Sequence, residues 1–183
     1  VTRFHQLGTV SVSPFKDLTY LARTSGQTFG MAVRSESPWL TLKDWVQAAK
    51  NQPGVLNYGT SGVGGAAHVG MEEFAMAAGI ELRHIPYKGV TDAMAATLSG
   101  TVNFTCSAAA NLLVQIKAGK LKAIVTTGEK RHPAMPGTPT FREADPAAGM
   151  VLTSWSILLA PRATPQPVLE RLNAVTTGMI RTP

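Results

Sequence analysis

The chain has 183 residues, of which 44% are hydrophobic and 15% are charged. This hydrophobic content is sufficient for a globular core, and the low density of charge excludes a disordered or polyelectrolyte chain. The 17 basic and 11 acidic residues leave a net charge of +6, which permits an anionic ligand but does not by itself indicate a nucleic-acid partner.

The N-terminal part of the chain is less regular than the rest. Residues 29–33 form its only clear strand pattern. From residue 41 onward, helical and strand patterns alternate. Thr41 and Asp44 have the spacing of a capping box, which predicts a helix that ends at residues 51–54, where Pro and Gly interrupt it.

Residues 55–127 alternate regularly between strand and helix. Strands are expected at 55–58, 81–87, 101–106 and 121–127, and helices at 66–78, 91–98 and 108–118. Strands separated by helices of this length need crossover connections. The pattern therefore predicts a parallel, right-handed α/β sheet with helices on both faces.

The pattern changes after this region. Residues 128–146 contain four prolines and predict an irregular connection with one short helix around Phe141. A strand is expected at 150–159. It should be followed by a helix with Thr164 as its N-cap and Pro165 at its first position.

A glycine-rich turn at residues 59–65 follows the strand 55–58. Its position at a strand-to-helix junction directs backbone N–H groups and the positive end of a helix to the carboxyl edge of a sheet. We therefore expect it to hold an anionic group. The alternative is that the glycines only permit a tight turn and close packing of the helix on the sheet.

The same turn also fits a dinucleotide-binding pattern formally, through Gly62, Gly64 and Ala67. The next strand, however, ends at Tyr87 and Lys88, where such a site needs an acid for the ribose. The turn also lacks the Lys-Ser/Thr pair of a P-loop and the second glycine of a nucleophile elbow. A dinucleotide-binding enzyme remains the alternative function.

Other chemically active side chains give weaker indications. His68 and Glu72 lie four residues apart on one expected helix, but no third metal ligand is evident, so no metal or cofactor is predicted. His84 is expected to be a satisfied core or interface histidine. Cys106, the only cysteine, excludes an internal disulfide and is expected to be a small buried apolar residue.

The hydropathy pattern and the two ends of the chain bear on membrane insertion and on truncation. No stretch approaches the roughly 18 apolar residues of a membrane span, so no direct membrane insertion is expected. The N-terminus has no apolar signal-peptide region, and the C-terminus stops within a helical pattern. We expect the chain to be truncated at both ends.

Several segments carry a family likeness. They are Leu56–Gly62 with His68, His84–Gly89, Gly100–Asn103, Ile116–Leu121, Pro136–Pro139 and Trp155–Pro161. In this order and spacing, the chain resembles the solute-binding receptors of tripartite tricarboxylate transporters, also called Bug receptors. The resemblance covers almost the whole sequence.

The resemblance implies a two-lobed α/β fold of the periplasmic-binding-protein type, with mainly parallel sheets flanked by helices. Residues 1–34 and 149–183 would belong to an incomplete first lobe, and residues 35–148 would form the second. Such a protein is a periplasmic, non-enzymatic receptor. It would capture a small carboxylate in an interlobe cleft and deliver it to the membrane permease subunits, without a nucleic-acid partner.

The resemblance also implies the ligand contacts of the second lobe. These are Thr60, Ser61, Gly62, Gly64, Gly65, Ser107 and Ala108. Asn103 replaces the usual Asp of the strand in relatives. Ser107 stands where many relatives have an Asp that can face the ligand, and the loss of that acid favours a carboxylate without an ammonium group. The family's first-lobe loop has no counterpart here, so a degenerate receptor that binds nothing tightly and acts as an interaction module is a further alternative.

Overall fold

The computed structural model describes residues 8, 10–145 and 151–180. The chain divides into two compact units, unit 1 (Val1–Gly26 and Ser154–Pro183) and unit 2 (Gln27–Thr153). The sequence-based boundaries at 34/35 and 148/149 differ from this division, and residues 146–150 lie outside the described residues. Strand residues 29–34 belong to unit 2 because they pair with its sheet. The assignment of the units to receptor lobes stays a prediction.

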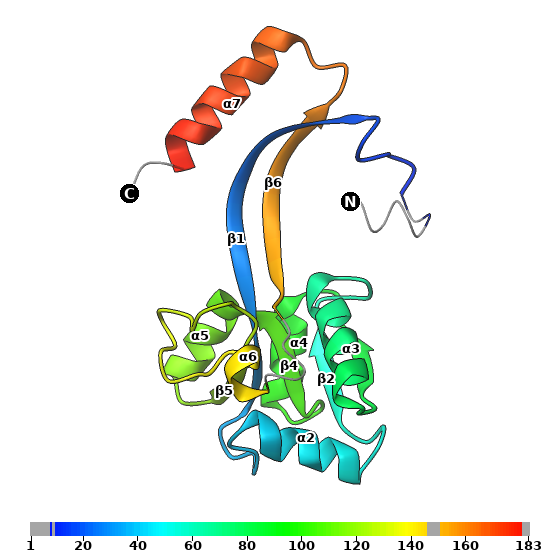
Figure 1. Cartoon of the computed structure of the whole chain (residues 1–183), viewed down its shortest axis with the longest axis vertical. Helices are drawn as coiled ribbons and strands as arrows, with labels where there is room; N and C mark the ends of the chain where they lie inside the picture. Colours follow the sequence, from blue (N-terminus) through cyan, green and yellow to red (C-terminus); the bar gives the residue numbers. More distant parts are fainter. Residues whose placement is uncertain (1–7, 9, 146–150, 181–183) are drawn as a thin grey trace. The chain divides into compact units, whose positions relative to one another are not determined.

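Unit 2 alternates strands and helices as expected (Figure 1). Its elements are part of β1 (Leu18–Arg34), α2 (Leu42–Asn51), β2 (Asn57–Thr60), α3 (Ala66–Ala78), β3 (Arg83–Pro86), α4 (Val90–Leu98), β4 (Phe104–Ala108), α5 (Ala109–Lys117), β5 (Leu121–Thr126) and α6 (Phe141–Ala144). The predicted bounds of α3 are confirmed. β2 and β4 both end two residues later than predicted, so Thr60 and Ala108 close strands instead of following them.

The sheet has the strand order β3-β2-β4-β1-β5. β2 runs parallel to β3 and β4, whereas β1 lies antiparallel between β4 and β5. The predicted α/β sheet flanked by helices is confirmed, but the sheet is mixed: β2 is parallel to both of its neighbours and β1 is antiparallel to both β4 and β5, a direction that was not foreseen. β1 enters the sheet from unit 1 and not through a helical crossover, so the rule for parallel βαβ units does not apply to it.

Helices cover both faces of the sheet, as alternate residues of β1 show. Met31 and Val33 belong to the larger hydrophobic cluster with residues of α2, α3 and α6. Ala32 belongs to a second cluster with residues of α4 and α5. Because successive side chains of a strand point to opposite faces, α2, α3 and α6 pack on one face and α4 and α5 on the other.

Thr127 joins three segments of unit 2 just after β5. Its Oγ1 accepts from the N–H of Phe29 at 2.9 Å and donates to the carbonyl of Leu152 at 2.6 Å. Its own backbone N–H donates to Phe29, and its carbonyl accepts from Leu152. The side chain is fully buried, so these bonds fix β1 at Phe29, and the residue that precedes β6 (Thr153–Pro161), next to the end of β5.

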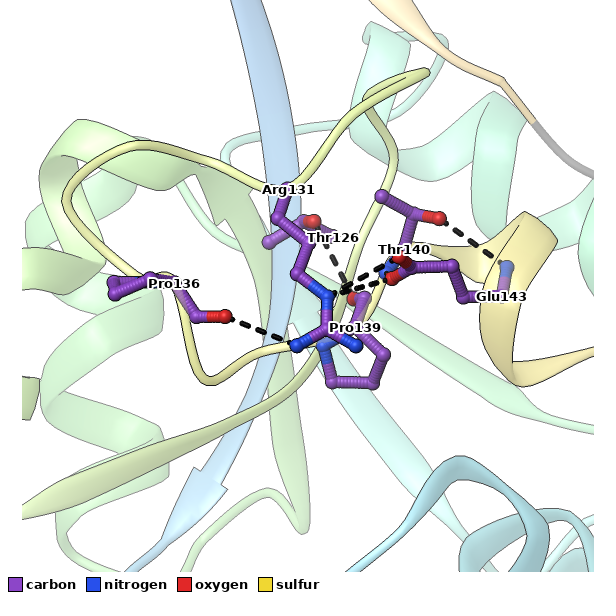
Figure 2. A network of polar contacts seen from close by, with 6 residues as sticks. All are labelled: Thr126, Arg131, Pro136, Pro139, Thr140 and Glu143. Carbon is purple, nitrogen blue, oxygen red and sulfur yellow. Dashed lines mark hydrogen bonds and ion pairs between the residues drawn. The ribbon is translucent and has the colours of Figure 1, made fainter.

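The proline-rich connection between β5 and α6 is held by a polar network (Figure 2). The Nε of Arg131 donates to Glu143 at 2.9 Å, and its guanidinium also donates to the carbonyl of Pro136. Glu143 in turn completes the capping box of Thr140. The bonds from Thr140 and Arg131 hold the pKa of Glu143 below its usual value. The predicted short helix around Phe141 is therefore confirmed, with a defined cap.

Unit 1 consists of the first part of β1, its partner β6 and α7 (Gln166–Ile180). Within it, Thr24 donates to the carbonyl of Ser156, and the guanidinium of Arg23 lies 3.9 Å from the ring centre of Trp155. α7 begins one residue later than predicted. None of the helices in the described part of the chain is long and apolar enough to span a membrane.

Candidate functional site

The candidate site lies at the carboxyl edge of the sheet in unit 2. β2, β3 and β4 run in the same direction, and β5 shares it because both β4 and β5 are antiparallel to β1. The register pairs Gly59 with Thr105. Thr60 and Ser107 therefore reach this edge on adjacent strands, and the structure brings the two predicted groups of ligand contacts together.

Three helices begin at this same edge without a side-chain cap. The N-caps of α3, α4 and α5 are Gly65, Gly89 and Ala108, and none of them makes a side-chain capping bond. In contrast, α2 and α6 have complete capping boxes at Thr41 and Thr140. Because the first N–H groups of a helix have no intrahelical partner, the edge presents open donors.

The glycine turn that leads into α3 needs its glycines for backbone reasons. Gly62 and Gly64 have φ values of 141° and 76°, which L side chains rarely adopt. Thr60 is buried, with 1% of its surface exposed, and it stabilises the turn. Its Oγ1 donates to the carbonyl of Gly62 and accepts from the Gly62 N–H. Ser61 is exposed, so its hydroxyl is accessible to a ligand.

Two histidines lie beside this turn. His68 of α3 and His84 of β3 stack with ring centres 4.0 Å apart. The Nε2 of His84 is 2.7 Å from Thr60 Oγ1, and the Nδ1 of His68 accepts the N–H of Gly64 at 3.1 Å. Both histidines therefore contact the turn, and the expectation of a satisfied histidine at position 84 is confirmed.

Burial favours the uncharged form of three side chains in and beneath the site. Burial, and then the neighbouring His68, lower the pKa of His84. Burial and the 2.7 Å bond to Glu72 raise the pKa of the Tyr58 hydroxyl. Burial also raises the pKa of the Cys106 thiol to about 12, which confirms that Cys106 is a small buried residue without an activated thiolate.

The predicted contact residues differ in whether their hydrogen-bonding groups already have a partner in the protein. The Gly64 N–H is bonded to His68, and Ser107 is 6% exposed and accepts from the side chain of Asn111. In contrast, the N–H groups of Ala66 and Ala67 have no protein acceptor among the described residues. Hence α3 offers ligand donors just beyond the predicted set.

Asn103 is not a ligand group in this arrangement. Its Oδ1 accepts the N–H of Asn57 at 2.9 Å, and its own N–H donates to Asn57 Oδ1 at 2.8 Å. These reciprocal bonds join the first residue of β2 to the residue that precedes β4, at the opposite edge of the sheet from the glycine turn.

The structure adds two residues that sequence reasoning did not assign to the site. Phe29 of β1 pairs with Ala108, and Thr127 bonds to Phe29, so both lie at the carboxyl edge. The run 29–33 identified a strand, but its position in the sheet depends on distant pairing that local patterns do not encode.

The formal metal and dinucleotide patterns find little support in the geometry. His68 Nε2 and Glu72 Oε1 are 3.9 Å apart, and the described residues contain no group of three or more His, Cys, Asp or Glu side chains that could hold a metal ion. After β3, the chain continues through Tyr87 and Lys88, where a dinucleotide site would need an acid.

Comparison with known proteins places this geometry in context. Residues 2–183 match the protein family described as "Tripartite tricarboxylate transporter family receptor". A relative from Cupriavidus necator, "UPF0065 protein in gbd 5'region", is 37% identical over 164 residues, which cover 90% of this chain and 49% of the relative. The chain spans about half the length of the curated relatives it matches.

Two solved structures with bound carboxylates are also similar. "R. palustris Rpa4515 with adipate" has a TM-score of 0.88 at 26% identity, covering 93% of this chain and 57% of that one. "MatC (Rpa3494) from Rhodopseudomonas palustris with bound malate" has a TM-score of 0.85 at 26% identity, covering 94% and 58%. These similarities confirm the α/β fold of the periplasmic-binding-protein type.

Proposed function

Because the chain belongs to the tripartite tricarboxylate transporter receptor family, we propose that it is part of a solute-binding receptor in which the carboxyl edge of unit 2 binds a small carboxylate. The observation that carries this proposal is the gathering of uncapped helix N-termini at one edge of the sheet. Open N–H groups and the positive ends of helix dipoles stabilise an anion. The related structures with adipate and malate support the same ligand class.

α3 and α5 are favoured over α4 for the anionic group. The first turns of α3 and α5 contain no acidic residue, whereas α4 carries Asp92 in its first turn. A carboxylate of the ligand would therefore contact the N–H groups of Gly65 to Ala67, with Ser61 as an additional hydroxyl donor. A carboxylate without an ammonium group suits this set of donors.

The receptor acts by binding alone in this proposal. It would be non-enzymatic, would lie in the periplasm, and would pass its ligand to the membrane permease subunits of the transporter. Among the described residues, the thiol of Cys106 is buried and protonated, and the histidines bond to the turn. This arrangement suits binding and offers no activated nucleophile.

Replacing Ser61 with alanine tests the proposed contact. We expect the affinity for malate or adipate to fall at least about tenfold, because a hydrogen bond to a charged group contributes roughly 1.5 to 3 kcal/mol. Isothermal titration calorimetry measures the loss. The matched control is Ser99→Ala, since the Ser99 hydroxyl bonds at the far end of α4, away from the carboxyl edge. Equal affinities of wild type and Ser61→Ala would contradict this contact.

The alternative functions are separated by a thermal-shift screen. The receptor predicts stabilisation of the wild-type chain by malate or adipate and no response to NAD, NADP or ATP. Stabilisation by a dinucleotide alone would instead favour the enzyme with a binding turn at Gly62, Gly64 and Ala67. No response to any of these compounds would favour a degenerate receptor that serves as an interaction module.

A further inference from the structure

The N–H of Gly64 has two competing acceptors if the turn binds an anion. In the structure it donates to the Nδ1 of His68 at 3.1 Å. An imidazole nitrogen accepts a hydrogen bond only when it carries no proton. The present arrangement therefore requires His68 to be unprotonated at Nδ1, and it withholds one of the turn's donors from the ligand.

The surroundings of His68 can accommodate one additional proton. Its Nε2 lies 3.9 Å from the carboxylate of Glu72, which is on the same helix. His84 of β3 stacks on the ring of His68. Tyr58 of β2 lies against the ring of His84, with centres 4.9 Å apart, and donates to Glu72. Tyr58 and Cys106 of β4, which are both buried, remain protonated and uncharged, since burial raises both of their pKa values.

The two histidines are not equally well placed to carry a positive charge. Burial and the neighbouring His68 lower the pKa of His84, so His84 stays neutral at neutral pH and keeps its 2.7 Å contact with Thr60. Two charged rings with centres 4.0 Å apart would also repel each other. The 3.9 Å separation from the Glu72 carboxylate makes His68 the better placed of the two rings to carry a positive charge.

We propose that His68 is a proton-coupled positioning residue, which holds the Gly64 N–H while neutral and releases it to the bound carboxylate when it becomes protonated. This inference rests on the proposed function of the turn. An anion next to the turn favours the imidazolium, so the complex binds more protons than the free protein. By linkage, affinity must then rise as the pH falls, by at most about tenfold per pH unit for one coupled proton.

His68→Asn separates hydrogen bonding from protonation. The Oδ1 of asparagine can accept the Gly64 N–H in place of Nδ1, but it cannot take up a proton. We expect the wild type to bind malate several-fold more tightly at about pH 6 than at about pH 8, whereas the variant binds with the same affinity at both values. Isothermal titration calorimetry in two buffers with different ionisation enthalpies measures affinity and proton uptake together.

His132→Asn is the matched control. The Nδ1 of His132 also accepts a backbone N–H, that of Ala134 at 3.2 Å, but it lies in the connection between β5 and α6. This variant should keep the pH dependence of the wild type. If it loses that dependence as His68→Asn does, the effect does not belong to the Gly64 contact and the inference is overturned.

The outcomes for the wild type distinguish the inference from the proposed function. Tight binding of malate without proton uptake and with equal affinity at both pH values would overturn the inference and leave the receptor function intact. No binding of malate or adipate at either pH would overturn both. If His68→Asn does not fold, amide NMR of the wild type decides: the Gly64 resonance must shift as His68 titrates, and an unchanged resonance refutes the coupling.

Discussion

Replacing Trp45 with alanine is expected to lower the free energy of unfolding by roughly 3 to 5 kcal/mol, the usual cost of deleting a buried tryptophan. Trp45 has no exposed surface. Its ring packs edge-on against Phe104 of β4, with centres 4.8 Å apart, and lies 6.3 Å from Phe74 of α3. The substitution therefore opens a cavity where α2, α3 and the sheet meet. Chemical denaturation of the whole chain measures the change.

Two further variants sharpen this prediction. The Nε1 of Trp45 is buried without an acceptor among the described residues. Trp45→Phe removes this unpaired donor and part of the ring, so it should cost less than Trp45→Ala. Trp155→Ala is the control, because Trp155 is 50% exposed in unit 1. If Trp45→Ala destabilises the chain no more than Trp155→Ala does, the packing described for unit 2 is wrong.

Replacing Gly64 with alanine is expected to reduce carboxylate affinity at least about tenfold, equivalent to about 1.4 kcal/mol of binding energy. Gly64 has a φ of 76°, and a non-glycine residue in this region costs roughly 1 to 2 kcal/mol. Relief of that strain would rotate the peptide groups between Ser61 and Gly65 and misalign the donors of the turn. Calorimetry with malate gives the affinity, and denaturation gives the stability.

The control variant must introduce the same backbone strain at a glycine outside the candidate site. Gly119 has a φ of 69°, and a Cβ atom there would meet nothing within 4 Å. It follows α5 at the opposite edge of the sheet. Gly119→Ala should therefore lose a similar amount of stability while keeping full affinity. Equal losses of affinity in both variants would show that strain, and not the geometry of the turn, determines binding.

Local patterns in the sequence predicted much of unit 2. The capping box at Thr41 and the glycine after α3 depend only on neighbouring residues, and the structure reproduces both helices. The alternation of strands and helices also predicted the parallel core and hence the common edge of β2 and β4. The location of the candidate site at that edge could thus be predicted from the sequence.

Features that depend on distant pairing could not be predicted in this way. β1 joins the sheet antiparallel between β4 and β5, and nothing within residues 18–34 specifies those partners. The bond from Gly64 to His68 and the stacking of His68 on His84 arise only once α3 and β3 are packed together. The spacing of His68 and Glu72 suggested at most a metal pair.

Mapping of a malate titration by amide NMR locates the ligand without any substitution. If the carboxyl edge of unit 2 binds the carboxylate, we expect the largest shifts at the N–H groups of Gly65, Ala66 and Ala67, with further shifts at the start of α5. Saturable shifts confined to another surface, such as the groove between α4 and α5 lined by Met94 and Val114, with unchanged amides at the start of α3, would contradict it.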